Sequence, residues 1–234
     1  HNCAIEPEIQ DLITFLNKMG CKIIWLGRRT IKIYGVKSLK KIKYKIMFDR
    51  IEAGTYMIAA CLTEGNLKIN GVNPKIIKTE INILKKIGAN IKIGSNVINV
   101  KGNKKIKSMD IKTEPYPGFP TDLQAQIMVL LCRADKRSVI SEKIFENRFM
   151  HVAELNRMGA KINIKGNKAY VEGSTSFKPA ELMATDLRAS VSLILAALTT
   201  KGKSTINRIY HLDRGYEKIE KKFRKIGAKI KRKN

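Results

Sequence analysis

The feature that most constrains the fold of this chain is an internal repeat. A glycine that follows Met or Ile and precedes Ala or Cys recurs at positions 20, 88, 159 and 227, at intervals of 68, 71 and 68 residues. A segment with apolar residues at helical spacing comes before the glycine. Two examples are Ile77, Ile81, Leu84 and Ile87 and, in the last copy, Tyr216, Ile219, Phe223 and Ile226. Because glycine there is typical of a left-handed C-cap, we predict that these helices end at the glycines.

Short runs with β-type composition follow two of these glycines. The predicted pairs are Asn90–Ile93 with Val97–Val100, and Lys161–Ile164 with Ala169–Glu172. Turn residues separate the members of each pair, namely Gly94-Ser95-Asn96 and Gly166-Asn167. These spacings predict β-hairpins.

A second pattern recurs out of phase with the first. Asp49, Thr121-Asp122 and Thr185-Asp186 each stand before an apolar stretch, where they are good helix N-cap residues. Glu52 and Gln124 lie at the spacing of a capping box. Each of these helices is expected to lead into a strand, at 66–72, 138–141 and 204–209.

Together the two patterns define a unit of helix, strand, helix, strand and strand. Three units begin at about Phe48, and the tail of another precedes them. We therefore predict a pseudo-threefold α/β lobe in which one helix of each unit packs centrally. The segment Gly35–Tyr44 is the most linker-like stretch of the chain.

The charge of the chain suggests a nucleic-acid partner, but its composition favours another explanation. Lys and Arg number 46 against 20 Asp and Glu, a net charge of +26. A strongly basic domain is typical of proteins that bind nucleic acid. However, 34 of the 46 are Lys, and the chain also holds 33 Ile and 16 Asn. Drift in an AT-rich genome explains all three excesses, so we expect no nucleic-acid partner; a nucleic-acid-binding module is the alternative.

The apolar stretches, the cysteines and the first residue of the sequence limit the class of protein further. The longest apolar stretch is Val191–Leu198, far below the ~20 residues of a membrane span, so we expect no membrane association. The four cysteines have no paired close spacing, which predicts neither a zinc site nor disulfides, and favours the reducing cytoplasm. The sequence begins at His1 rather than Met, so we expect a fragment of a longer protein.

Arg188 lies in the first turn of its predicted helix, where a cation opposes the helix dipole by about 0.3–1 kcal/mol. An anionic ligand at converging helix N-termini would reverse that cost. The alternatives are an ion pair with Asp186 and simple solvation.

Asp122 follows a loop that contains Pro115, Pro117 and Pro120. A carboxylate fixed by a rigid loop can bind a sugar hydroxyl or remove its proton. The alternative is a carboxylate that caps its own helix.

Two aromatic residues, Phe145 and Phe149, flank Arg148 before a predicted helix. This arrangement suits stacking on a flat ring with a phosphate nearby. The alternative places the aromatics in the core and Arg148 in a surface ion pair. His151 and His211 are interpreted as structural, and we expect no metal site.

Four long motifs in these regions resemble bacterial UDP-N-acetylglucosamine 1-carboxyvinyltransferases, a family of enolpyruvyl transferases. They are Pro115–Gln126, Phe145–Val152, Ala184–Ser190 and Arg208–Glu217, with further similarity at Glu6-Pro7-Glu8 and Asp49–Glu52. The resemblance implies an inside-out α/β barrel fold with two lobes of three units each. Residues 1–47 would be the tail of the first lobe, and 48–234 the second lobe.

The resemblance also implies an activity. The family transfers the enolpyruvyl group of phosphoenolpyruvate to the 3-hydroxyl of UDP-N-acetylglucosamine and releases phosphate, the first committed step of peptidoglycan synthesis in the bacterial cytoplasm. No cofactor is implied. The partner would be the missing N-terminal lobe, which carries the family's cysteine general acid, so we predict that the chain alone is inactive.

By the same resemblance, Asp122 would be the base for the sugar hydroxyl and Arg188 would engage phosphoenolpyruvate; these are the two expected catalytic residues. The resemblance places further substrate-binding residues at Ile144, Phe145, Arg148, Asp186, Glu6 and Glu8.

Overall fold

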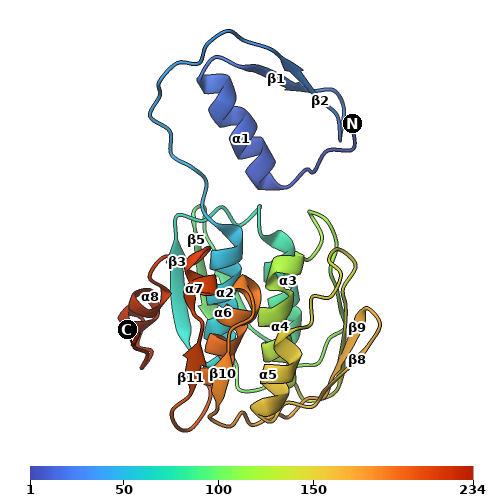
Figure 1. Ribbon diagram of the computed structural model, residues 1–234, viewed down its shortest axis with the longest axis vertical. Helices are drawn as coiled ribbons and strands as arrows, with labels where there is room; N and C mark the ends of the chain where they lie inside the picture. Colours follow the sequence, from blue (N-terminus) through green and yellow to red (C-terminus); the bar gives the residue numbers. More distant parts are fainter. Residues whose placement is uncertain (234) are drawn as a thin grey trace.

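A computed structural model describes residues 1–233, which form two bodies joined by an extended segment (Figure 1). The smaller body contains α1 (Pro7–Lys18) and an antiparallel pair of strands, β1 (Lys22–Trp25) and β2 (Ile31–Tyr34). Residues 35–49 contain no helix or strand and lead to the larger body. This segment includes the predicted linker, but its end is held to α1, because the Tyr44 hydroxyl donates to Asp11 Oδ1 at 2.8 Å.

Three helices fill the centre of the larger body. They are α2 (Arg50–Leu62), α4 (Gln124–Cys132) and α6 (Leu187–Ala197). α4 packs against both of the others and every one of its residues is buried. A helix that is apolar on all sides is stable only when other elements surround it. The prediction that one helix of each unit packs centrally is therefore confirmed.

Sheets and outer helices surround these central helices (Figure 1). The first sheet is antiparallel and has the order β3 (Asn66–Asn70), β5 (Val97–Lys101), β4 (Asn90–Ile93). The second has the order β6 (Ile111–Lys112), β7 (Ser138–Ser141), β9 (Lys168–Val171), β8 (Ile162–Lys165). The third consists of β10 (Glu181–Met183) and β11 (Thr205–Asn207), paired in parallel. The outer helices are α3 (Lys78–Ile87), α5 (His151–Arg157), α7 (Tyr210–Asp213) and α8 (Ile219–Lys225).

The repeated glycines have the backbone conformation that the sequence predicts. Their φ angles are +109° at Gly20, +119° at Gly88, +96° at Gly159 and +102° at Gly227. Side chains other than hydrogen are disfavoured in this region, which explains why glycine recurs there. Each glycine ends a helix and turns the chain toward the next segment.

The third unit differs from the prediction. No strand follows Gly227 within the residues that the structure describes, so the last pair of strands is not formed. Tyr216 also lies outside the expected helix, because α8 begins at Ile219 after Lys218, which has a φ of +45°. The short strands β6 and β10 were not predicted, since two or three residues carry no measurable periodicity.

The predicted N-cap is correct at α2, whereas at α6 the cap is Asp186, the second residue of the predicted Thr185-Asp186 pair. Asp49 accepts hydrogen bonds from the Ile51 and Glu52 amides, and Asp186 from those of Arg188 and Ala189. Thr121 does not cap α4. It begins a single 3-10 turn, η1 (Thr121–Leu123), which precedes the helix.

The capping box at α2 is half formed, since the Glu52 amide donates to Asp49 but the Glu52 side chain does not return the bond, and the one at α4 is not formed. Glu52 instead accepts a hydrogen bond from Lys222 Nζ at 2.7 Å, which ties α2 to α8. The Gln124 amide is buried and neither of its polar atoms has a partner among the described residues.

Across residues 1–233, no helix is long and apolar enough to cross a lipid bilayer. The four cysteines are free thiols. Cys61 and Cys132 are buried, and burial raises the pKa of each to about 12, so both are protonated at neutral pH.

Candidate functional site

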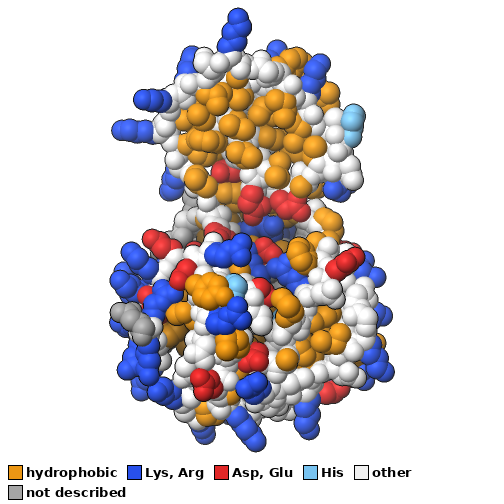
Figure 2. All heavy atoms as spheres, in the orientation of Figure 1, with side chains coloured by type: hydrophobic (Ala, Val, Ile, Leu, Met, Phe, Trp, Pro, Cys, Tyr) orange, Lys and Arg blue, Asp and Glu red, His pale blue; other side chains and the backbone are white. Residues whose placement is uncertain are grey.

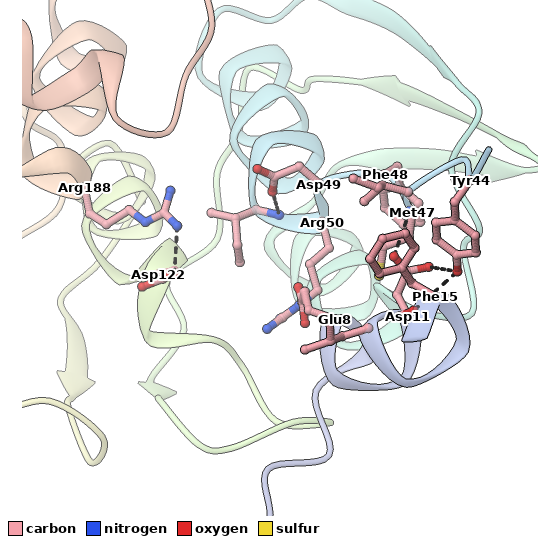
Figure 3. Close-up of a pocket in the computed structure, with 13 residues that line it drawn as sticks. Glu8, Asp11, Phe15, Tyr44, Met47, Phe48, Asp49, Arg50, Asp122 and Arg188 are labelled. Carbon is pink, nitrogen blue, oxygen red and sulfur yellow. Dashed lines mark hydrogen bonds and ion pairs between the residues drawn. The ribbon is translucent and has the colours of Figure 1, made fainter. Parts of the chain in front are cut away.

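The candidate site is a cleft of about 670 Å³ between the two bodies. The start of α1 and the linker contribute one wall, including Glu8 and Tyr44. The N-terminal end of α2 contributes Asp49 and Arg50, and the far wall holds Asp122 and Arg188 (Figure 3). Central helix N-termini therefore lie at the cleft, as the predicted convergence requires.

Asp122 lies between two arginines from other segments of the lobe. Its Oδ1 accepts a hydrogen bond from Arg148 Nη2 at 2.7 Å, and its Oδ2 accepts one from Arg188 Nη2 at 2.8 Å. Both arginines are mostly buried, with exposed fractions of 17% and 16% for their side chains. Paired and partly desolvated groups of this kind form strong charge-assisted hydrogen bonds.

These contacts decide between the alternatives left open by the sequence. Asp122 does not cap its own helix, because its oxygens accept from the arginines and η1 and α4 have no side-chain cap. Arg188 does not pair with Asp186, whose carboxylate accepts backbone amides instead. Three residues spread over the chain are thus brought to one point by the fold.

The charge state of Asp122 follows from its partners. Burial by itself would raise the pKa of this carboxyl, but the charges and hydrogen bonds of Arg188 and Arg148 outweigh it and lower the pKa. The carboxyl is therefore ionised at neutral pH. An ionised carboxylate between two guanidinium groups combines a proton acceptor with donors for an anionic ligand.

A buried hydrogen-bond network lies behind Arg188. The Tyr216 hydroxyl lies 2.9 Å from Thr55 Oγ1, 3.3 Å from Gln126 Nε2 and 3.4 Å from Arg188 Nη1. Because the Thr55 hydroxyl donates to the Ile51 carbonyl, its oxygen is left to accept the Tyr216 proton. The lone pairs of Tyr216 then face Arg188 and Gln126. One phenol thus links two central helices to the arginine.

The segment after β7 forms a second hollow, of about 710 Å³, whose lining includes Ile144, Phe145 and Arg148. The Phe145 side chain is 61% exposed, and the Arg148 guanidinium lies 4.9 Å from the centre of its ring. Phe149 is buried in the core. Phe149 therefore fits the alternative of a core residue. Phe145 fits the alternative of a ring that is free to stack, because it is exposed beside an arginine.

Glu6 and Glu8 lie where the two bodies meet. Glu8 accepts a hydrogen bond from Arg50 Nε at 2.7 Å, and Glu6 accepts one from the Tyr116 amide at 3.4 Å. Arg50 also lies 3.8 Å from Glu80 and 5.7 Å from the Tyr116 ring. These contacts join α1 to the proline-rich loop and leave Glu8 at the edge of the cleft.

The two predicted structural histidines differ in burial. His151 is 2% exposed, and burial lowers its pKa to about 4, so it is neutral at neutral pH. His211 is half-buried. Among residues 1–233, no group of three or more His, Cys, Asp or Glu is arranged to hold a metal ion.

Several residues that complete the site were not predicted from the sequence. They are Thr55, Gln126, Glu142 and Tyr216 behind the cleft, and Arg50 at its edge. A weak signal existed for Thr55 and Gln126, because each is polar within an otherwise apolar helix. Tyr216 was assigned to a helix face, and its hydroxyl partners come from distant segments that no local pattern relates.

Comparison with known proteins gives one family. The family model for EPSP synthase (3-phosphoshikimate 1-carboxyvinyltransferase) matches residues 1–223. A protein of Pelagibacter ubique named UDP-N-acetylglucosamine 1-carboxyvinyltransferase is 71% identical over 233 residues, covering 100% of this chain and 56% of the relative. The protein of the same name from Desulfosudis oleivorans is 51% identical over 99% of this chain and 55% of its own length. The chain thus spans about half the length of the curated relatives it matches.

Solved structures agree with this assignment. The enolpyruvyl transferase NikO from Streptomyces tendae superposes with a TM-score of 0.90 at 26% identity, over 98% of this chain and 55% of that protein. EPSP synthase from Acinetobacter baumannii, at 20% identity and a TM-score of 0.71, shares the fold. The match of the family model over nearly the whole chain, together with these folds, shows that the chain belongs to the EPSP synthase family of enolpyruvyl transferases.

Proposed function

We propose that this chain is the C-terminal part of a bacterial UDP-N-acetylglucosamine 1-carboxyvinyltransferase that acts in the cytoplasm in peptidoglycan synthesis. The names of the relatives at 71% and 51% identity support this choice within the family. The observation that carries it is the placement of Asp122 between Arg148 and Arg188 at the edge of the cleft. The proposed substrates are UDP-N-acetylglucosamine and phosphoenolpyruvate.

In the proposed reaction, Asp122 accepts the proton of the sugar 3-hydroxyl while that oxygen attacks the second carbon of phosphoenolpyruvate. The methylene carbon gains a proton from the other lobe. Loss of a proton from the resulting methyl group and departure of phosphate then restore the double bond. The lowered pKa of Asp122 keeps the carboxylate ionised and ready to accept.

The two arginines have a second role in this scheme. In the free protein both pair with Asp122, and the three side chains together keep one net positive charge. An anionic substrate that binds them would weaken their hold on the carboxylate, and the pKa of Asp122 would rise. Substrate binding would thus increase the basicity of Asp122 while the arginines stabilise charge that develops on phosphate.

The proposed partner is the first lobe of the same enzyme, of which the smaller body would be the end. Large hydrophobic side chains on this body are exposed, including Leu26 at 50% and Ile33 at 69%. Figure 2 shows hydrophobic side chains gathered over its face. A helix with one pair of strands is too small to bury such a face alone. Preceding residues of a longer chain would cover it.

The experiment joins this chain to the N-terminal lobe of the 71% identical relative and measures phosphate release from phosphoenolpyruvate. Turnover is expected with UDP-N-acetylglucosamine and not with shikimate 3-phosphate. Removal of the proposed general base typically costs about 10²–10⁴-fold, so Asp122→Asn is expected to lose activity within that range. Asp213→Asn is the matched control, because Asp213 is exposed and pairs with Arg232 outside the cleft. Turnover with the shikimate substrate, or full activity of Asp122→Asn, would contradict the proposal.

A further inference from the structure

Glu142 is a buried carboxylate with four hydrogen-bond donors. It directly follows β7 and is 3% exposed. Its Oε1 accepts from Thr113 Oγ1 at 2.7 Å and from the Ile144 and Phe145 amides at 2.8 and 3.0 Å. Its Oε2 accepts from Thr121 Oγ1 at 2.9 Å. An ionised carboxylate only accepts hydrogen bonds, and both oxygens of Glu142 are engaged, with three donors on Oε1 and one on Oε2.

The donors belong to two different parts of the site. Thr121 begins the 3-10 turn and immediately precedes Asp122. Ile144 and Phe145 begin the segment that lines the second hollow. One buried side chain therefore fixes the turn that carries Asp122 and the backbone beside Arg148.

The turn that carries Asp122 and the segment that begins at Ile144 also meet through a second set of contacts. The Phe145 ring lies 4.9 Å from the Arg148 guanidinium, which donates to Asp122 Oδ1 at 2.7 Å. The contacts form a closed ring that runs from Glu142 through Phe145, Arg148 and Asp122 to Thr121 and back. If Glu142 is removed, the ring opens on its buried side, and only the contact from Arg148 to Asp122 still joins the two segments within this ring.

We propose that Glu142 is a positioning residue that sets the geometry of Asp122 and Arg148 without touching substrate. The effect of this positioning on turnover rests on the proposed function. The positioning of Asp122 and Arg148 itself can be tested without substrate. The hydrogen bonds predict which substitutions are tolerated. Gln keeps the shape, and its amide nitrogen can donate to Thr121, since a hydroxyl also accepts. Ala leaves four donors without an acceptor.

The first test uses the chain itself and follows the Asp122 carboxyl by carbon-detected NMR while pH is varied. In the unchanged chain the pKa of Asp122 is expected to lie below its ordinary value of 3.8. E142A is expected to raise it toward 3.8, since Arg148 is no longer held beside it. E142Q is expected to leave it lowered. An unchanged Asp122 pKa in E142A would overturn the proposal.

Ser138→Ala is the matched control. Ser138 is buried at the other end of β7, and its hydroxyl oxygen accepts one hydrogen bond from the Met109 amide. This variant loses buried hydrogen bonding far from Asp122, so the pKa of Asp122 should stay lowered. A shift in S138A as large as in E142A would show a general loss of structure and overturn the proposal.

If E142A does not fold, the same titration is carried out on Thr121→Val, because this variant removes only the donor to Glu142 Oε2. A raised Asp122 pKa supports the proposal and an unchanged one overturns it.

The second test measures turnover in the joined two-lobe protein. A misplacement of about 1 Å can cost about 10²-fold in rate, so E142A is expected to lower kcat/KM to that extent and E142Q to restore it. Full activity of E142A would overturn the catalytic part of the proposal. Failure of the unchanged joined protein to turn over would instead count against the proposed function. The Asp122 titration would still decide the structural part, because it needs no substrate.

Discussion

Asp122 links the charge of the site to the stability of the lobe. Its pKa is lowered in the folded chain from an ordinary value of 3.8, despite the opposing effect of burial, because Arg188 and Arg148 hold the charged form. Between the folded and the unfolded pKa, the unfolded chain binds more protons. Stability therefore rises with pH across this window, is fully gained above about pH 4, and is lost as pH falls through the folded pKa.

This linkage predicts the behaviour of Asp122→Asn. The free-energy difference of unfolding between the unchanged chain and the variant should shrink as pH falls below about 4, since protonation removes the charge that the substitution removes. Urea denaturation at a series of pH values measures this difference. Glu217→Gln serves as the control for removal of a carboxylate, because Glu217 is exposed and lies outside the lining of the cleft. A difference for Asp122→Asn that stays constant from pH 3 to pH 7 would contradict the ion-pair interpretation.

Tyr216 provides a second prediction at this scale. Tyr216→Phe keeps the buried ring but removes a hydroxyl that contacts Thr55, Gln126 and Arg188. A buried hydrogen bond contributes about 0.5–1.5 kcal/mol, so the variant is expected to lose stability within that range. Urea denaturation at pH 7 measures this change.

Tyr56→Phe is the matched control for that experiment. The Tyr56 hydroxyl is buried and has no hydrogen-bond partner among residues 1–233, while its ring packs 4.9 Å from that of Phe223. Its removal should be neutral or slightly stabilising, because an unpaired buried hydroxyl is unfavourable. Equal losses in both tyrosine variants would show that the network behind Arg188 contributes nothing.

The individual residues of the site differed in how far they could be predicted. Arg188 stood out because a cation in a first turn opposes the helix dipole, and the pairing with Asp122 offsets that cost. Asp122 stood out because three prolines precede it. Glu142 could not be found in this way. Its four donors come from separate segments, and only the packed fold brings them together.

At the scale of elements, the structure shows a further repeated glycine that was not predicted from the sequence. Gly102 and Gly173 follow equivalent strands, β5 and β9, and both approach the end of a central helix. A Cβ on Gly102 would lie 2.3 Å from the Ala60 carbonyl oxygen, and one on Gly173 would lie 2.2 Å from that of Ala134. These distances are below any permitted contact. Glycine is required at both positions by the close approach of two backbones.

Gly102→Ala is therefore expected to destabilise the chain. The clash is with backbone rather than with a flexible side chain, so the strand or the end of α2 must move. Overpacking of this kind costs about 1–3 kcal/mol. Gly35→Ala is the control, because an added Cβ there meets nothing within 4 Å and the backbone is not left-handed. Thermal and urea unfolding should separate the two variants, and an equal effect would contradict the close-approach argument.

The elements that could be predicted were those with local signals. The hairpin strand β4 and the inner strand β7 have the predicted bounds, because alternation and turn residues define them. α7 and the parallel strands β6 and β10 were missed, since they are too short for a pattern. The last helix was predicted to begin too early, at Tyr216. Its apolar periodicity starts there, but the backbone is left-handed at Lys218 and the helix begins after it.

At the scale of the whole molecule, the two bodies that line the cleft differ in how many hydrophobic residues they bury. The larger body has a continuous core around three buried helices. In the smaller body, Ile13 and Ile23 are the only buried hydrophobic residues before residue 48 in the part that the structure describes. Hydrogen bonds between the bodies include one from Arg50 to Glu8 and one from the Tyr116 amide to Glu6. The unequal burial supports the proposal that a first lobe would cover the smaller body.

The exposed face of the smaller body predicts self-association of the chain. The visible face of the smaller body carries a broad apolar patch, and a large exposed patch of this kind drives association (Figure 2). Ile33 on β2 is the most exposed large hydrophobic residue of this body, at 69%. Ile33→Lys should therefore reduce the apparent mass measured by analytical ultracentrifugation and lower the binding of a hydrophobic dye. Ile93→Lys is the matched control, because Ile93 is 51% exposed on β4 of the larger body. Joining the N-terminal lobe of the relative should have the same effect as Ile33→Lys. A monomeric chain with little dye binding would show that this face does not need a cover.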